Sequence, residues 1–330
     1  MAYSRNNLIP RFPVSVAPHN TRSKLIELLG LSEIPNEVDY TKYNSRHEEG
    51  VCLTDLSFTN SLGEKIPAIL MEPLNAGDNL LPGVVCIDGT GGTAERLANN
   101  KYYMENQDRG PLFGWGRELA KRGFITLGIT PKGCELRRQS EEAWAIENKH
   151  LAPFGISQMG LLVEESLRAV NILSGQNRVI SNNVGLTGMS LGGNAAWYAM
   201  ACAPWLKTAV PICGGVGKLT SVINECDGYR HSAYYYIPHM LRFFDHPQIV
   251  ANCIAPRPFM LVAPTEDEDM PKSGVDELKK FVTPVYSQVG QTENFHVYQP
   301  KGTHCFKMEY FDWMVDWFNH FLNESKTNRA

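Results

Sequence analysis

Residues 188–193 read Gly-Met-Ser-Leu-Gly-Gly and place a serine at a predicted junction between a strand and a helix. The preceding residues 184–187 form a short apolar segment typical of a buried strand, and residues 194–202 have the composition of a packed helix. A G-x-S-x-G segment in this context holds the serine on a sharp turn with its hydroxyl exposed. Glycines at 188 and 192 avoid side chains that would collide with the neighbouring helix and strand. We therefore predict that Ser190 is a nucleophile, with a plain Gly-Ser turn as the alternative.

A serine hydroxyl needs a base, and the base needs an acid to orient it. When the serine follows a central strand in this way, the acid and then the histidine are expected later in the chain. His304 follows the last predicted strand in a Gly-Thr-His loop, and we predict that it is the base. His296 lies inside that strand, where its side chain is fixed to one face, and is a weaker candidate.

The acid is expected among four consecutive carboxylates at residues 266–269. Asp267 is preferred because it lies three residues after Pro264, at the end of a predicted strand. Asp269 and then Glu266 remain alternatives, since the choice depends on geometry. A solvated acidic loop accounts for the carboxylates that take no part.

The expected oxyanion donors are two backbone amides. The amide of Leu191 lies at the start of a helix, where it can donate to a developing negative charge. The second donor is expected in residues 88–93, Asp-Gly-Thr-Gly-Gly-Thr, after an earlier strand. We favour the amide of Thr90, with Gly91 as the alternative, and expect Gly89 and Gly91 to border the substrate.

The same loop matches the dinucleotide-binding pattern G-x-G-x-x-A at residues 89–94. No acidic residue follows a second strand about 20 residues later, as that function requires. The pattern also fails to explain Ser190, Asp267 and His304 together. A G-K-[ST] phosphate loop and zinc-ligand spacings are both missing from the sequence, so we expect no cofactor and no metal.

Two strands forming a hairpin precede an alternation of strands and helices, which predicts an α/β fold with a mostly parallel sheet and helices on both faces. The predicted strands are 51–59, 65–72, 83–88, 124–130, 184–189, 208–213, 258–263 and 295–299. The predicted helices are 23–31, 113–122, 156–174, 193–203, 273–290 and 308–323.

Residues 51–330 are expected to form one domain, preceded by residues 1–50 as an arm and a helix packed on the core. We expect Ser23 to cap that helix and Gly30 to end it. Insertions are predicted near 93–112 and 215–250. The second is rich in aromatic residues and histidine, which favours a small lid whose His231 and Tyr234 contact the substrate. A packing extension is the alternative.

The composition excludes several classes of protein. The chain has 330 residues, 43% of them hydrophobic, which is enough for a large core. A net charge of −4 does not favour nucleic acid or an anionic membrane as a partner. No apolar run is long enough to span a membrane, and no signal sequence is evident. Eight scattered cysteines favour free thiols and a cytoplasmic protein. An oligomer is compatible with the sequence.

These features together resemble the α/β-hydrolase superfamily, and most closely its dienelactone-hydrolase and acetyl-xylan-esterase-like branch. The resemblance covers residues 50–325 and rests on segments 123–127, 188–193, 230–238, 255–258, 265–267 and 302–304. It implies an eight-stranded, mostly parallel sheet, a triad of Ser190, Asp267 and His304, and no cofactor. The usual His-Gly of the oxyanion loop is Asp88-Gly89 here. Dienelactone hydrolases carry cysteine where this chain has Ser190, so dienelactone is not implied as the substrate.

We therefore expect a serine hydrolase that cleaves a carboxylic ester through an acyl-enzyme. Its substrate would be a small-molecule ester: a small acyl ester, a lactone or an acetyl group. The alternatives are a C–C hydrolase, acyltransferase or peptidase of the same fold, or a non-catalytic binding protein.

Overall fold

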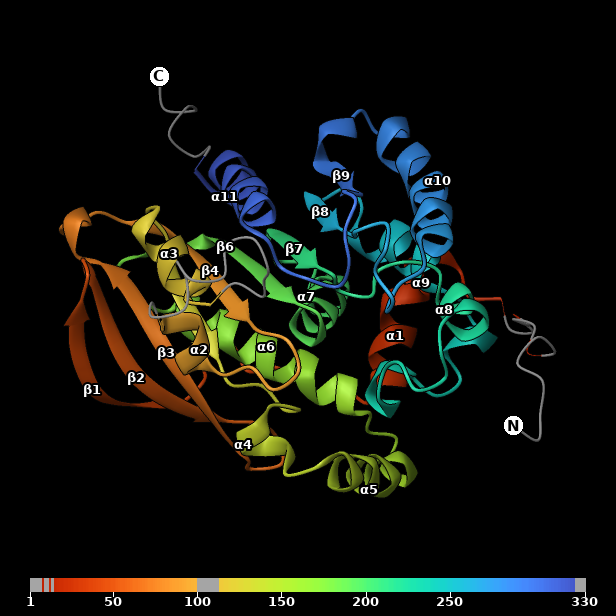
Figure 1. Cartoon of the computed structure of the whole chain (residues 1–330), viewed down its shortest axis with the longest axis horizontal. Helices are drawn as coiled ribbons and strands as arrows, with labels where there is room; N and C mark the ends of the chain where they lie inside the picture. Colours follow the sequence, from red (N-terminus) through yellow and green to blue (C-terminus); the bar gives the residue numbers. More distant parts are fainter. Residues whose placement is uncertain (1–7, 9–11, 13–14, 100–112, 324–330) are drawn as a thin grey trace.

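The computed structural model describes residues 15–99 and 113–323 together with Leu8 and Phe12, and it places a nine-stranded sheet between two layers of helices (Figure 1). The strand order among these residues is β1-β2-β3-β5-β4-β6-β7-β8-β9. The bounds are β1 Tyr40–Glu48, β2 Val51–Thr59, β3 Lys65–Pro73, β4 Leu81–Ile87, β5 Ile125–Ile129, β6 Val179–Met189, β7 Thr208–Ile212, β8 Phe259–Val262 and β9 Phe295–Tyr298.

The sheet is mostly parallel, as predicted. Strands β1, β2 and β3 pair antiparallel, and β3 also pairs antiparallel with β5. All the remaining pairs, from β5 through β4 and β6 to β9, are parallel. The residues of β5 and β7 are buried throughout, which is why their sequences are continuous apolar runs rather than alternating ones. The carboxyl ends of six parallel strands therefore meet at one edge.

The ninth strand, β1, is a correction to the predicted count of eight. It pairs with β2 at the edge of the sheet, with a register shift between Lys42 and Ser45. Its residues are almost all exposed. A strand that buries neither face has no alternating apolar pattern, so the sequence gives no periodic signal for it. The strand β6 also begins at Val179, earlier than the predicted residue 184.

The helices form two layers, each packed on its own hydrophobic core (Figure 1). One core joins the sheet to α1 (Thr21–Leu29), α6 (Gln158–Ser174), α7 (Leu191–Cys202) and α10 (Lys272–Gln288). The other joins it to α2 (Ala94–Ala98), α3 (Trp115–Lys121) and α11 (Met308–Asn323). Helices on both faces were predicted, and the six predicted helices agree with α1, α3, α6, α7, α10 and α11 to within a few residues. The helix at Glu141–Leu151 and the short helices α2, α8 (Leu219–Glu225) and α9 (His246–Ile249) were not predicted.

The first helix, α1, begins earlier than predicted. It starts at Thr21 after Asn20, and Ser23 is not its cap, because the Ser23 hydroxyl donates to the Asn20 carbonyl at 2.9 Å. A serine inside the first turn can bond back to the preceding backbone, and it then resembles a cap in sequence alone. Gly30 ends the helix in the left-handed conformation (φ +63°), as predicted.

Residues 215–250 contain α8 (Leu219–Glu225), α9 (His246–Ile249) and short turns between them. Tyr235 and His246 are fully buried, whereas Tyr229 is 98% exposed. Most apolar residues of this segment belong to the same core as α7 and α10. These contacts favour a packing extension over a detached lid. Of the other predicted insertion, residues 100–112 lie outside the described residues.

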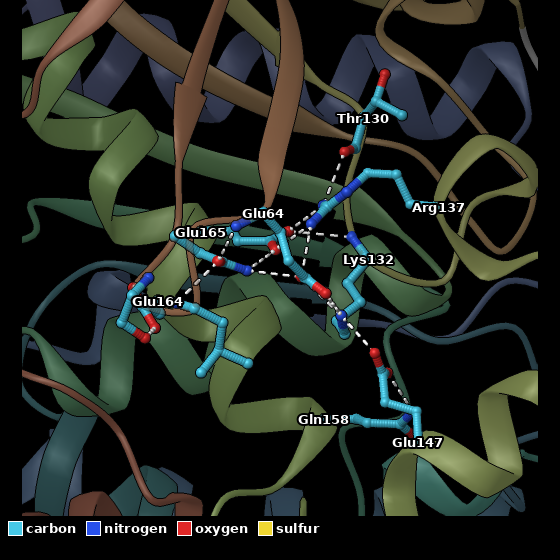
Figure 2. A network of polar contacts seen from close by, with 11 residues as sticks. Glu64, Thr130, Lys132, Arg137, Glu147, Gln158, Glu164 and Glu165 are labelled. Atoms are coloured by element: carbon cyan, nitrogen blue, oxygen red, sulfur yellow. Dashed lines mark hydrogen bonds and ion pairs between the residues drawn. The ribbon is translucent and has the colours of Figure 1, made fainter.

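A network of charged residues with two buried cations, Lys132 and Arg137, lies beside α5 (Glu141–Leu151), as Figure 2 shows. The Lys132 ammonium, 2% exposed, lies 2.7 Å from carboxylate oxygens of both Glu64 and Glu147. The Arg137 guanidinium makes two hydrogen bonds to Glu165, at 2.7 and 2.8 Å. The network ties the β2–β3 turn, the segment after β5, α5 and α6 to one another.

All eight cysteines are free thiols, and most are buried. Within the described residues, no helix combines the length and the apolar composition needed to cross a bilayer.

Candidate active site

Ser190 lies between β6 and α7 in a strained turn, with φ +52° and ψ −116°. Its amide donates to the Ile212 carbonyl of β7 at 2.9 Å, which anchors the turn to the sheet. A Cβ on Gly188 would lie 2.3 Å from the carbonyl carbon of Gly192, so this position requires glycine. A non-glycine residue at positive φ is strained and persists only where the surroundings hold it. The turn therefore has the geometry that the sequence predicted for a nucleophile.

The structure brings Ser190, His304 and Asp267 into one hydrogen-bonded chain. His304 Nε2 lies 2.8 Å from Ser190 Oγ, and His304 Nδ1 lies 2.8 Å from Asp267 Oδ1. A carboxylate can only accept, so Nδ1 carries the proton and Nε2 is free to accept one from the serine hydroxyl. A serine hydroxyl, an imidazole and a carboxylate joined in this order are the arrangement that nucleophilic catalysis by a serine needs.

The three candidate acids lie in different places. Asp267 is buried and holds His304 Nδ1. Asp269 faces the other ring nitrogen, with Oδ2 3.5 Å from Nε2. Glu266 is 51% exposed and points to Lys301 at 3.9 Å. Asp267 alone of the three therefore contacts the nitrogen that an orienting acid must hold.

Backbone hydrogen bonds fix the acid and base loops against each other. The amide of Thr265 donates to the Pro300 carbonyl, and the amide of Glu266 donates to the Gly302 carbonyl, each at 2.9 Å. The Asp269 amide donates to Asp267 Oδ1 at 2.9 Å, which holds the carboxylate in place. The site thus lies at the carboxyl ends of β6, β8 and β9, where open α/β sheets bind ligands.

The carboxylates around His304 determine its proton affinity. Burial alone would lower the pKa of the imidazole. The hydrogen bond to Asp267 and the charges of Asp267, Asp269 and Glu268 outweigh burial, and they raise the His304 pKa above its ordinary 6.5. An imidazole with a raised pKa is a stronger base, and Ser190 Oγ lies 2.8 Å from its Nε2.

Cys213, at the end of β7, is a site residue that the sequence analysis did not single out. Its thiol, Asp267 and His304 lie with their ligand atoms within 4.8 Å of one another, the only such group among the residues the structure describes. Burial and the Asp267 charge raise the Cys213 pKa well above its ordinary range, so the group is a thiol. Metal binding needs the thiolate, and a metal would displace His304 from Asp267. The geometry therefore fits a triad better than a metal site.

The loop after β4 lies directly beside Ser190. A Cβ on Gly89 would lie 3.3 Å from Ser190 Cβ. The Gly89 amide donates to Asp88 Oδ1 at 2.8 Å, and the Gly92 amide donates to the Gly89 carbonyl at 2.8 Å. Asp88 is buried, and Arg96 lies 3.0 Å from its Oδ2, so the Asp88 carboxylate holds this turn in place.

The amides predicted as oxyanion donors belong to Thr90, with Gly91 as the alternative, in the loop after β4, and to Leu191 at the start of α7. Thr90 is exposed at the tip of the turn, and Gly91 has φ +81°. Leu191 is the first residue of α7, so no carbonyl of its own helix can accept from its amide. Their role as donors remains a prediction, because it depends on the position of a substrate oxygen.

The two aromatic residues predicted to contact the substrate have different surroundings. His231 stacks on Tyr235 at 3.9 Å between ring centroids, and its Nε2 lies 2.6 Å from the Asp269 carbonyl. It is therefore linked to the site through Asp269. Tyr234 is buried against Trp144, with 6.0 Å between ring centroids, and has little surface to offer a ligand.

Known proteins with the same architecture support the fold. No protein-family model matches the chain. The sequence is 28% identical over 285 residues to "Putative hydrolase YtaP" of Bacillus subtilis (strain 168), which covers 86% of this chain and 92% of that protein.

Two solved structures are similar over almost the whole chain. A "putative acetyl xylan esterase" from Bacteroides fragilis NCTC 9343 has a TM-score of 0.72 at 18% identity, with 96% of this chain and 93% of that one covered. A glucuronoyl esterase from Solibacter usitatus has a TM-score of 0.65 at 13% identity, covering 90% and 91%. The chain has the α/β-hydrolase fold, with one additional strand at the edge of the sheet.

Proposed function

We propose that this protein is a serine hydrolase that cleaves a carboxylic ester through an acyl-enzyme. The observation that carries the proposal is the chain of two 2.8 Å contacts from Ser190 through His304 to Asp267. The strained turn at Ser190 supports it, because backbone strain of this kind in a non-glycine residue is concentrated at active sites. The names of the similar proteins, a hydrolase and two esterases, point to the same chemistry.

In the first half of the reaction, Ser190 Oγ attacks the ester carbonyl carbon while its proton passes to His304 Nε2. Asp267 keeps the Nδ1 proton in place and stabilises the imidazolium. The carbonyl oxygen becomes an oxyanion, which the amides of Leu191 and Thr90 would stabilise. The intermediate then collapses, and the leaving alkoxide takes the proton from His304 and departs as the alcohol.

In the second half, a water molecule attacks the acyl-enzyme and gives its proton to His304 Nε2. Collapse of the second intermediate breaks the bond to Ser190 Oγ, which recovers the proton from His304. The products are one carboxylic acid and one alcohol for each ester and water consumed. Small acyl esters, lactones and acetyl groups are all substrates of this chemical class.

Hydrolysis of a p-nitrophenyl ester series from acetate to decanoate tests the proposal. We expect turnover with a chain-length optimum, and a loss of about 10⁶ in kcat for Ser190→Ala. Ser23→Ala, at an exposed serine of α1, is the matched control and should retain activity. Equal activity of Ser190→Ala and wild type would contradict the proposal.

Labelling with a fluorophosphonate separates the remaining functions. An activated serine forms a covalent adduct, whereas a binding protein of the same fold does not. Labelling at Ser190 without turnover of simple esters would indicate a different scissile bond or acyl acceptor. Absence of both labelling and turnover would indicate a binding protein.

A further inference from the structure

The carboxylate of Asp269 lies on the side of the His304 imidazole that faces Ser190. Its Oδ2 is 3.5 Å from His304 Nε2, the nitrogen that lies 2.8 Å from Ser190 Oγ. Asp267, by contrast, is on the far side of the imidazole ring, at Nδ1. An orienting acid needs only the Asp267 position, so the second carboxylate calls for a separate explanation.

Asp269 is held in place by contacts from both sides of its backbone. Its amide donates to Asp267 Oδ1 at 2.9 Å, and its carbonyl oxygen lies 2.6 Å from His231 Nε2. His231 is in turn stacked on the buried Tyr235. The side chain of Asp269 is only 18% exposed, so its charge is in a fixed position at the site.

The charge of Asp269 is only partly compensated. Arg230 Nη1 lies 3.5 Å from Asp269 Oδ1, but the same guanidinium lies 3.3 Å from Glu268. Among the residues that the structure describes, Asp269 Oδ1 is buried and receives no hydrogen bond. Asp267 adds a third carboxylate within the same loop. One guanidinium therefore faces both Glu268 and Asp269, and the carboxylate of Asp267 lies in the same loop, so carboxylates outnumber guanidinium groups beside His304.

We infer that Asp269 is a specificity-determining residue that makes this site select esters without a negative charge near the scissile bond, and prefer neutral and cationic ones. The inference rests on the proposed ester hydrolysis and names the class of substrate for it. An anionic ester would bring a charge close to Asp269 as Ser190 attacks. At low ionic strength, two like charges about 8 Å apart at an effective dielectric constant of about 20 repel strongly enough to reduce binding more than tenfold.

Two nearly isosteric esters test this inference: 4-carboxyphenyl acetate, which is anionic, and 4-carbamoylphenyl acetate, which is neutral. At about 10 mM ionic strength, where screening is weak, we expect the wild type to favour the neutral ester by about tenfold in kcat/KM, after correction for the rates with hydroxide. Asp269→Asn should reduce this preference about tenfold. The cationic 4-(trimethylammonio)phenyl acetate should be favoured by the wild type and lose that advantage in Asp269→Asn.

Two further variants keep the result interpretable. Glu266→Gln removes the same charge from the same loop at a carboxylate that points to Lys301, and it should leave the preference within about twofold. Arg230→Gln removes the compensating cation and should increase the preference for the neutral ester. The Arg230 side chain is 42% exposed, and Arg230→Gln leaves Asp269 in place, so this variant tests the same charge if Asp269→Asn fails to fold.

The outcomes separate this inference from the proposed function. Equal effects of Asp269→Asn and Glu266→Gln, or no change with Arg230→Gln, would overturn the role of Asp269 while leaving ester hydrolysis intact. A wild-type protein without Ser190-dependent turnover of the neutral ester would overturn the proposed function, and the role of Asp269 with it.

Discussion

Gly192 lies directly against the carbonyl oxygen of Ile87, so that a methyl group on Gly192 would be 2.1 Å from that oxygen. Neither group can move without disturbing β4 or α7. We expect Gly192→Ala to lower the free energy of unfolding by about 3 kcal/mol or more, since the clash is with backbone. Chemical denaturation of the variant and the wild type measures this difference in the free energy of unfolding. Gly175→Ala is the control, because its nearest neighbour would be 3.5 Å away, and a change there within about 1 kcal/mol is expected.

The two aspartates near His304 should differ in their contribution to the rate. Asp267→Asn replaces the acceptor at Nδ1 and favours the wrong imidazole tautomer, so kcat should fall by about 10⁴. Asp269→Asn leaves the Nδ1 contact intact, and the fall in kcat should be far smaller. Steady-state kinetics on one neutral ester compares them. A larger loss for Asp269→Asn would transfer the role of orienting acid to that residue.

The acid limb of the pH–rate profile should report the environment of His304. The base must be neutral, so kcat/KM falls as the pH drops through its pKa. The contact with Asp267 and the charges of Asp267, Asp269 and Glu268 raise that pKa despite burial, and the limb should lie above pH 6.5. Asp269→Asn should move the limb to lower pH, while Glu266→Gln should not. An unmoved limb would mean that Asp269 exerts no field at His304.

His246 should make the fold sensitive to acid. Burial lowers its pKa to about 4, from 6.5 in the unfolded chain. The folded state therefore binds fewer protons than the unfolded state between these values, and stability present above pH 6.5 is lost as the pH falls towards 4. The full difference corresponds to about 3 kcal/mol.

Denaturation midpoints between pH 7.5 and 4.5 measure this effect. His246→Gln cannot titrate and should flatten the pH dependence below pH 6.5, whatever its absolute stability. His47→Gln, at an exposed position of β1, should leave the dependence as in the wild type. Parallel curves for His246→Gln and wild type would show that another group controls acid unfolding.

Removing one cation from the charge network of Figure 2 should lower the free energy of unfolding. Lys132→Met leaves Glu64 and Glu147 without the ammonium that both contact. Lys132 is buried, but the side chains of Glu64 and Glu147 are 35% and 31% exposed, so water partly replaces the lost cation and we expect a cost of about 1–3 kcal/mol. Lys272→Met breaks an exposed pair with Asp276 and should have little effect. Similar losses for the two variants, measured by urea denaturation, would contradict the importance of burial here.

Much of the fold could be predicted because the central strands are buried on both faces. Such strands are continuous apolar runs, and the chain offers them at regular intervals between amphipathic helices. The position of Ser190 could be predicted for a related reason. Close backbone contacts require glycine at positions 188 and 192, and these two glycines are visible in the sequence as part of the G-x-S-x-G pattern.

The features that the sequence could not predict depend on interactions between distant parts of the chain. The strand β1 has no apolar face, and only its pairing with β2 defines it. The choice among Glu266, Asp267 and Asp269 depends on how the loop is held by Gly302 and Pro300. The proximity of Cys213 to Asp267 and His304 follows from the pairing of β7 with β8, which no local pattern encodes.

The position of the three site residues in the chain has a consequence for folding kinetics. Ser190 and His304 are 114 residues apart, and three strands, β7, β8 and β9, lie between them in the chain and pair in the sheet beside β6. Contacts between residues so distant in sequence form slowly, because closing long loops costs entropy before any contact is gained. During refolding, a partly ordered intermediate without the last strands would have helical structure but no working site. Recovered turnover is therefore a late reporter of folding, and it should lag behind the circular dichroism signal.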